Sequence, residues 1–136
     1  MALLTGSNKI KTAVFISGTG SNLKSLIQFS KLKKSPIVIE MIISNNAKSK
    51  GLQYAKVYKI KKKVFDFKNN SSEKKVIDEL KKNNINLICL AGFMKILSKN
   101  FIKSFKGQIL NIHPSLLPKY KGLNTHEKAI ENKDKY

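Results

Sequence analysis

Thr12-Ala13-Val14-Phe15-Ile16-Ser17-Gly18-Thr19-Gly20-Ser21-Asn22 is the stretch that decides the fold, because in it an apolar run passes directly into a glycine turn. Apolar residues at helical spacing follow from Leu23 onward, so the sequence predicts a strand, a tight turn and a helix with Ser21 or Asn22 as its N-cap. Glycines allow a ligand to approach the backbone, and the N–H groups of a helix N-terminus suit a phosphate. A plain strand-to-helix turn is the alternative, since the pattern is neither a dinucleotide-binding fingerprint nor a Walker A loop.

Apolar runs alternate with amphipathic stretches along the rest of the chain. Further strands are predicted at 37–43, 64–65, 87–91 and 108–110, and helices at 51–58, 73–83, 99–105 and about 125–132. The helix at 73–83 has Ser71-Ser72 as its predicted cap and a buried stripe of Val76, Ile77 and Leu80. This alternation predicts one α/β domain over residues 1–136, with a Rossmann-like, open, mainly parallel sheet and helices on both faces.

A second stretch that carries chemistry, Asn111-Ile112-His113-Pro114, follows the predicted strand at 108–110. Residues two apart in a strand point to the same face, so Asn111 and His113 are expected side by side. Pro114 cannot donate to a sheet ladder and ends the strand, at the edge where open α/β sheets bind ligands. The amide can donate to a developing oxyanion, and the imidazole can carry a proton near neutral pH. A histidine held in a polar loop, without a catalytic role, is the alternative.

The chain carries a formal charge of +19, and all 27 basic residues are Lys. Proteins that read nucleic acids favour Arg, which makes bidentate contacts to phosphate and guanine. Abundant Lys together with Asn and Ile is typical of A/T-rich coding sequences. We therefore interpret the charge as a solvated, Lys-rich surface and expect no specific nucleic-acid partner.

The sequence predicts a cytoplasmic protein without a membrane span or a metal site. The single cysteine, Cys89, cannot form an internal disulfide, fits a reducing compartment and stands in an apolar run as a small core residue. No apolar stretch approaches the roughly 18 residues of a membrane span, and residues 1–9 lack the apolar core of a signal peptide. Cysteine and histidine are not clustered at the spacing of metal ligands.

Three motifs together resemble a known family. They are Ile16-Ser17-Gly18-Thr19-Gly20-Ser21-Asn22, Leu90-Ala91-Gly92-Phe93-Met94-Lys95-Ile96-Leu97 and Leu110-Asn111-Ile112-His113-Pro114-Ser115-Leu116-Leu117-Pro118-Lys119-Tyr120-Lys121-Gly122, which span nearly the whole chain. In these motifs the sequence resembles the glycinamide ribonucleotide (phosphoribosylglycinamide) formyltransferases, folate-dependent enzymes of purine biosynthesis. The third motif is partly shared with other formyltransferases, whereas the first points to the glycinamide ribonucleotide branch.

The resemblance implies the substrates and the residues of the site. Enzymes of this family transfer a formyl group from 10-formyltetrahydrofolate to the amine of 5'-phosphoribosylglycinamide on the route to IMP. By resemblance, Asn111 and His113 would be catalytic, and the substrate phosphate would be held by Gly20, Ser21 and Asn22. The formylfolate site would be formed by Met94, Lys95, Ile96, Leu97 and Asn111. From composition alone, however, the Met and aromatic cluster at 93–97 is more typical of a core than of a ligand site.

The sequence departs from the family pattern in two places. The family has a third catalytic residue, an Asp, beyond the segment that matches Glu131-Asn132-Lys133, and Asp134 stands too early to take that role. An Arg that family members often carry in mid-chain has no match, since the Asn69 region aligns there. We therefore expect an N-terminal part of such an enzyme, with reduced or no activity by itself. An exposed sheet edge at its end would favour self-association.

Two other functions stay open at this point. A methionyl-tRNA formyltransferase-like enzyme is favoured slightly by the positive charge, although enzymes of that kind carry an additional basic C-terminal domain. A basic nucleic-acid-binding domain would bind DNA or RNA with a steep dependence on salt. It gives no reason for Asn111 and His113 to stand together.

Overall fold

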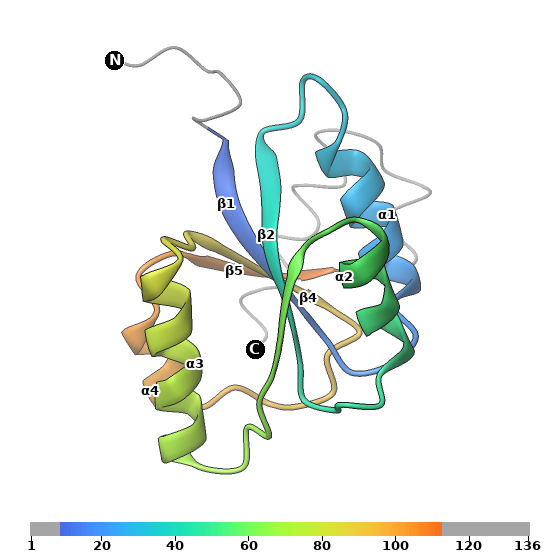
Figure 1. Cartoon of the computed structure of the whole chain (residues 1–136). Helices are drawn as coiled ribbons and strands as arrows, with labels where there is room; N and C mark the ends of the chain where they lie inside the picture. The colour runs from blue at the N-terminus through green and yellow to red at the C-terminus, as the bar shows by residue number, and fades with distance from the viewer. Residues whose placement is uncertain (1–8, 113–136) are drawn as a thin grey trace, which may run out of the picture.

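The sheet is the frame of the molecule in a computed structural model that describes residues 9–112 (Figure 1). Its strands lie in the order β3-β2-β1-β4-β5, and every neighbouring pair is parallel. The prediction of an open, mainly parallel α/β sheet is confirmed. The bounds are Ile10–Ile16 for β1, Ile37–Ser44 for β2, Lys61–Val64 for β3, Leu87–Ala91 for β4 and Gln108–Ile112 for β5.

Helices cover both faces of this sheet, as the sequence predicted (Figure 1). One face carries α1 (Ser21–Ser30) and α2 (Gln53–Val57), the latter preceded by the 3₁₀ turn η2 (Lys50–Leu52). The other face carries α3 (Asn70–Lys82) and α4 (Lys99–Ser104). Within residues 9–112, no helix has the length and apolar character needed to cross a bilayer. The helix predicted near 125–132 lies outside the described residues.

The central strand β1 fixes where a ligand site can lie. Its residues from Ala13 to Ile16 are fully buried, because Val14 packs toward α1 and Phe15 packs toward α3 and α4. A strand covered on both faces must be apolar at every position, which explains the unbroken apolar run. The strand order reverses between β1 and β4. In open α/β sheets, the carboxyl ends of the strands at such a reversal form the ligand-binding crevice.

The N-cap of the first helix lies one residue before the earlier of the two predicted caps. Gly20, with φ 79° and ψ 24°, is the N-cap of α1, and neither Ser21 nor Asn22 takes that place. The turn needs a left-handed backbone conformation, which glycine adopts without a steric cost. The prediction of a side-chain cap was therefore wrong, and the helix starts without one.

The cap of α3 and the position of β3 also differ from the prediction. Asn69 caps α3 in place of Ser71: its side chain accepts a hydrogen bond from the Ser72 N–H (2.9 Å), and the Ser72 hydroxyl accepts one from the Asn69 N–H (3.2 Å). This capping box satisfies two N–H groups at once. The edge strand β3 ends at Val64, whereas the sequence predicted a strand that starts there. The prediction missed residues 61–63 because exposed lysines do not show the apolar pattern of a strand. Lysines on an edge strand hinder pairing with other chains.

Cys89 lies in β4 and is buried, as predicted for a small core residue. Burial raises the pKa of the Cys89 thiol to about 12, because the thiolate would lose its hydration. The folded protein therefore holds the thiol proton more tightly than the unfolded chain does. The stability that this group contributes is complete below the unfolded thiol pKa of about 8.5. It is lost as the pH rises from there toward 12.

We predict that iodoacetamide near pH 8 leaves Cys89 unmodified in the folded protein and alkylates it after unfolding in urea, as read by intact mass. The variant Cys89→Ala is the control for the pH effect. Its free energy of unfolding should fall less than that of the wild type as the pH is raised above the unfolded thiol pKa. Alkylation of the folded chain at the rate of the unfolded chain would contradict the burial of β4.

Candidate active site

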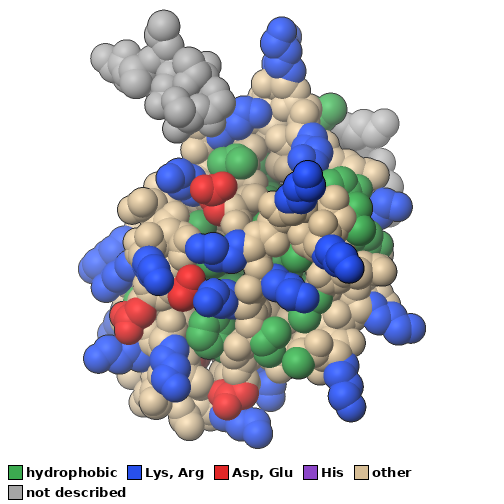
Figure 2. All heavy atoms as spheres, in the orientation of Figure 1, with side chains coloured by type: hydrophobic (Ala, Val, Ile, Leu, Met, Phe, Trp, Pro, Cys, Tyr) green, Lys and Arg blue, Asp and Glu red, His purple; other side chains and the backbone are tan. Residues whose placement is uncertain are grey.

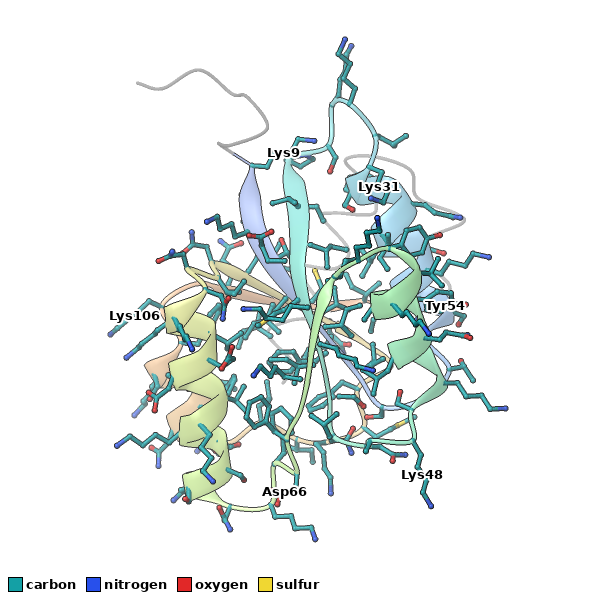
Figure 3. The ribbon with its side chains drawn as sticks, viewed as in Figure 1. Lys9, Lys31, Lys48, Tyr54, Asp66 and Lys106 are labelled. Carbon is teal, nitrogen blue, oxygen red and sulfur yellow. The ribbon has the colours of Figure 1, made fainter. Side chains whose placement is uncertain are left out.

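Three loops meet at the carboxyl ends of β1, β2 and β4, and the hydroxyl of Ser17 connects them. It donates a hydrogen bond to Oδ1 of Asn45 (2.5 Å), in the loop after β2, and accepts one from the N–H of Met94 (2.7 Å), in the loop after β4. Figure 3 shows this edge of the sheet at the bottom of the view, where the labelled Lys48 and Asp66 lie in the loops after β2 and β3. The three loops therefore form one continuous surface at the point where the strand order reverses.

The glycine turn after β1 is fixed by the segment that follows β2. The Gly18 carbonyl accepts hydrogen bonds from the Gly51 N–H (2.9 Å) and the Ser49 hydroxyl (2.6 Å). The backbones of Gly20 and Gly51 are in contact, since a Cβ added to Gly20 would lie 2.7 Å from the Gly51 Cα. Only two glycines allow so close an approach. The sequence analysis missed the role of Gly51, because a close contact with a distant segment leaves no local pattern.

The N-terminus of α1 opens onto this turn. The first hydrogen bond of the helix runs from the Lys24 N–H to the Gly20 carbonyl (2.9 Å), and no side chain caps the preceding N–H groups. Backbone N–H groups at such an end, together with the helix dipole, favour an anion. Of the residues predicted to hold a phosphate, Gly20 is buried, Ser21 is exposed and Asn22 is half-buried. All three stand at one helix end, and Gly20 contacts the Gly51 backbone.

The loop after β4, residues 92–98, exposes apolar side chains between two buried anchors. Phe93 packs edge-on against Phe15 and Phe67, with ring centroids 5.3 Å and 4.9 Å apart, and Leu97 is buried. Between them, Met94 and Ile96 are 80% and 86% exposed. The composition-based interpretation of this cluster as core is therefore wrong for these two side chains and correct for Leu97. Lys95 is also exposed, so the segment offers an apolar and basic surface to a ligand.

The end of this loop is held by a buried carboxylate. Glu73, in the first turn of α3, is 8% exposed. Its Oε1 accepts from the Ser98 hydroxyl (2.5 Å) and its Oε2 from the Ser98 N–H (3.1 Å). The Ser98 Oγ in turn accepts from the Phe101 N–H (3.0 Å) and so caps α4. The sequence analysis missed the hydrogen-bonding role of Glu73. An acidic residue in the first turn of a helix is common, because it interacts favourably with the helix dipole.

Asn111 lies in β5 and is half-buried, opposite Leu90 of β4. Its neighbours Leu110 and Ile112 belong to the apolar layer under α1, whereas Ile109 belongs to the layer under α3 and α4. Strand alternation therefore places Asn111 on the α3 and α4 face, the face on which Phe93 and Leu97 pack. His113 lies outside the described residues, so its predicted place beside Asn111 stays a prediction.

The loop before α3 is shaped by local hydrogen bonds. The Asp66 carboxylate accepts from the Lys68 N–H (2.9 Å), and this bond, followed by one to the Ser72 side chain, holds the pKa of Asp66 below its usual value. Asn69 caps α3 at the end of the same loop. Among the described residues, no group of three or more His, Cys, Asp and Glu side chains is arranged to hold a metal ion.

Comparison with known proteins gives the family. The sequence model described as "Formyl transferase" matches residues 10–136. The chain belongs to the formyl transferase family. This confirms the resemblance that the three motifs predicted, and the parallel sheet with helices on both faces is the family's fold.

Two curated relatives and a solved structure illustrate the similarity. Phosphoribosylglycinamide formyltransferase from Haemophilus influenzae is 48% identical over 128 residues, which cover 91% of this chain and 60% of the relative. The trifunctional purine biosynthetic protein adenosine-3 from Gallus gallus is 46% identical over 132 residues, 92% of this chain and 13% of the relative. The crystal structure of phosphoribosylglycinamide formyltransferase from Brucella melitensis superposes with a TM-score of 0.73 at 38% identity, covering 91% of this chain and 67% of that one. The chain thus spans only part of the curated relatives' length.

We predict that Gly51→Ala destabilises the formyl transferase chain by about 1–3 kcal/mol, as overpacking of a tight contact does. Its Cβ would lie 2.7 Å from Cδ1 of Ile16 and 2.9 Å from the Gly20 Cα. Gly18→Ala is the matched control in the same turn, since its Cβ would meet no atom within 4 Å. Urea unfolding of both variants gives the measurement, and equal stabilities would refute the close contact of the Gly20 and Gly51 backbones.

Proposed function

We propose that this site transfers a formyl group from 10-formyltetrahydrofolate to the amine of 5'-phosphoribosylglycinamide, a step of IMP biosynthesis. The observation that carries the proposal is the Ser17 hydroxyl, which joins the loop after β4 to the glycine turn at the reversal of strand order. Two substrates must meet in such a reaction. The Ser17 hydrogen bond joins the glycine turn, which suits an anion, to the loop at 92–98, which suits an aromatic ligand. The names of the relatives, phosphoribosylglycinamide formyltransferase, support the acceptor and the transferred group.

The phosphate of 5'-phosphoribosylglycinamide would bind at the start of α1. The N–H groups of Ser21 and Asn22 and the Asn22 amide would donate to its oxygens, and the closely packed Gly20 leaves room for the approach. A phosphate at this end gains from the helix dipole without a dedicated basic side chain. The rest of the substrate would then extend along the edge of the sheet toward β4 and β5.

The formyl donor would bind against the loop at 92–98. The exposed side chains of Met94 and Ile96 would cover the flat rings of the folate, and the backbone of Lys95 would donate and accept hydrogen bonds. Leu97 is buried, so it would contribute its backbone and not its side chain. Asn111 lies on the same face of the sheet as this loop, next to where the formyl group would be held.

The proposed chemistry is an acyl transfer without a covalent enzyme intermediate. The substrate amine attacks the formyl carbon, and negative charge develops on the formyl oxygen in the tetrahedral intermediate. The Asn111 amide would donate a hydrogen bond to that oxygen. The His113 imidazole would carry the proton that leaves the amine and would pass it to the folate nitrogen as the carbon–nitrogen bond breaks. We propose that this happens in the cytoplasm, in line with the free, buried Cys89.

Substrate binding is the direct test of the proposal, because the proposed phosphate subsite at the start of α1 lies within the described residues. We predict that Asn22→Asp weakens binding of 5'-phosphoribosylglycinamide about tenfold or more, since a carboxylate beside the phosphate repels it. Binding of the same compound without its phosphate should be unchanged by the substitution. Isothermal titration of both compounds gives the two dissociation constants.

The control is Asn46→Asp, at the same edge of the sheet but in the loop after β2 and not in the first turn of α1. It adds the same charge to the protein and should leave both constants close to wild type. Equal weakening by Asn22→Asp and Asn46→Asp would mean that the phosphate does not lie at the start of α1. A wild-type chain that binds neither compound would refute the proposed function itself.

A second candidate, a methionyl-tRNA formyltransferase-like enzyme, is favoured by the charge of +19. The lysines in Figure 2 are spread over the whole visible face, with acidic side chains among them, and do not gather in one patch. This distribution fits a solvated surface better than a nucleic-acid interface. We predict that filter binding to tRNA is weak and is abolished by raising the salt from low to physiological concentration. Tight, salt-resistant binding of tRNA would favour the second candidate.

A further inference from the structure

The loop at 92–98 is fixed at its two ends by different groups. At its start, Phe93 packs on the aromatic cluster and the Met94 N–H donates to Ser17. At its end, both polar groups of Ser98 donate to one side chain, the carboxylate of Glu73. The exposed segment from Met94 to Ile96, which we propose to contact the formyl donor, spans the distance between these anchors.

Glu73 uses both of its carboxylate oxygens on Ser98 while being 8% exposed. A buried carboxylate is costly unless hydrogen bonds and favourable dipoles compensate for its lost hydration. Here the two hydrogen bonds from Ser98, the N-cap of α4, and the place of Glu73 in the first turn of α3 offset that cost. Figure 1 shows these two helices side by side on one face of the sheet. The carboxylate therefore joins α3 to the beginning of α4.

The packing of α3 does not require this carboxylate. Its stripe of Val76, Ile77 and Leu80 is buried and secures the helix on the sheet. An apolar side chain at 73 would fill the same place without the need to satisfy a buried charge. The carboxylate instead fixes the position of Ser98 through two hydrogen bonds, close behind the exposed segment of the loop.

We infer that Glu73 is a positioning residue for the formyl donor, which acts through Ser98 to hold residues 94–97 in their binding conformation. The inference rests on the proposed function, since it names what the loop positions. Glu73 itself does not touch the donor. Removing its hydrogen bonds leaves the start of the loop anchored at Ser17 and loosens its end, where the packing of Leu97 remains. The cost therefore falls on binding of the donor and not on binding of the phosphate-bearing substrate at the start of α1.

The test compares Glu73→Gln with Asp78→Asn, a matched control on an exposed position of the same helix. A glutamine keeps one acceptor and turns an NH₂ group toward a Ser98 donor, so it loses about one of the two hydrogen bonds. In Glu73→Gln we expect the dissociation constant for 10-formyltetrahydrofolate to rise about five- to tenfold and that for 5'-phosphoribosylglycinamide to change less than twofold. Asp78→Asn should change neither. Ser98→Ala should reproduce the donor defect, and the double variant should add little to it.

A readout without ligands tests the loop directly. Lys95 is an exposed trypsin site within the segment, and trypsin needs a mobile backbone to cleave. Cleavage after Lys95 should become at least severalfold faster in Glu73→Gln, while the control keeps the wild-type rate. Should Glu73→Gln fail to fold, Ser98→Ala gives the same comparison.

The outcomes separate the inference from the proposed function. Wild-type chain that binds neither substrate refutes the proposed function and this inference with it. Wild-type binding of the donor that Glu73→Gln and Ser98→Ala leave unchanged, or cleavage after Lys95 that they do not accelerate, overturns the inference alone. Equal loss of affinity for both substrates also overturns it, because Glu73 would then support the fold in general and not the donor loop.

Discussion

The hydrogen bonds of one hydroxyl group, that of Ser17, hold the site together. Parallel strands leave their carboxyl ends as separate loops, and nothing in a sheet ladder joins those loops to each other. Ser17 directly follows the central strand β1, whose residues 13–16 are fully buried, so its position is set by the core on both faces of the sheet. Because its hydroxyl donates to Asn45 and accepts from Met94, Ser17 fixes the loops after β2 and β4 relative to the core. The glycine turn and the loop at 92–98 thereby keep a fixed relation.

The contact of Gly20 with Gly51 serves the same end by a different physical means. Neither residue has a side chain, so the two backbones can meet, and the left-handed φ of Gly20 turns the chain from β1 into α1 without a side-chain cap. The N–H groups at the start of α1 are then left for a ligand, because the glycine has no side chain with which to satisfy them. A serine or asparagine cap would stabilise the helix itself but would occupy the groups that the proposed phosphate needs.

Periodicity and composition predicted the buried strands and the fold class. They did not predict contacts between residues that are far apart in the sequence. β1 and β4 were recognisable because strands covered on both faces must be apolar throughout. Gly51 and Glu73 were missed, since their partners lie on other elements and their local patterns are those of an ordinary turn and an ordinary first helical turn. Met94 and Ile96 show a different kind of error. Their apolar composition predicts burial, but Gly92 and the anchored ends of the loop turn these side chains outward. Whether His113 lies beside Asn111 falls outside the described residues.

The two proposed subsites lie on opposite faces of one sheet edge, and this arrangement bears on the reaction. The start of α1 belongs to one face, while the loop at 92–98 and Asn111 belong to the other. A substrate held by its phosphate on the first face must cross the carboxyl end of β1 or β4 for its amine to reach a formyl group on the second. The crossing point is where Ser17 joins the loops, so the residue that fixes the distance between the subsites also borders the path between them. Positioning of this kind, and not the strength of either subsite alone, is what makes attack by one bound molecule on another effectively intramolecular.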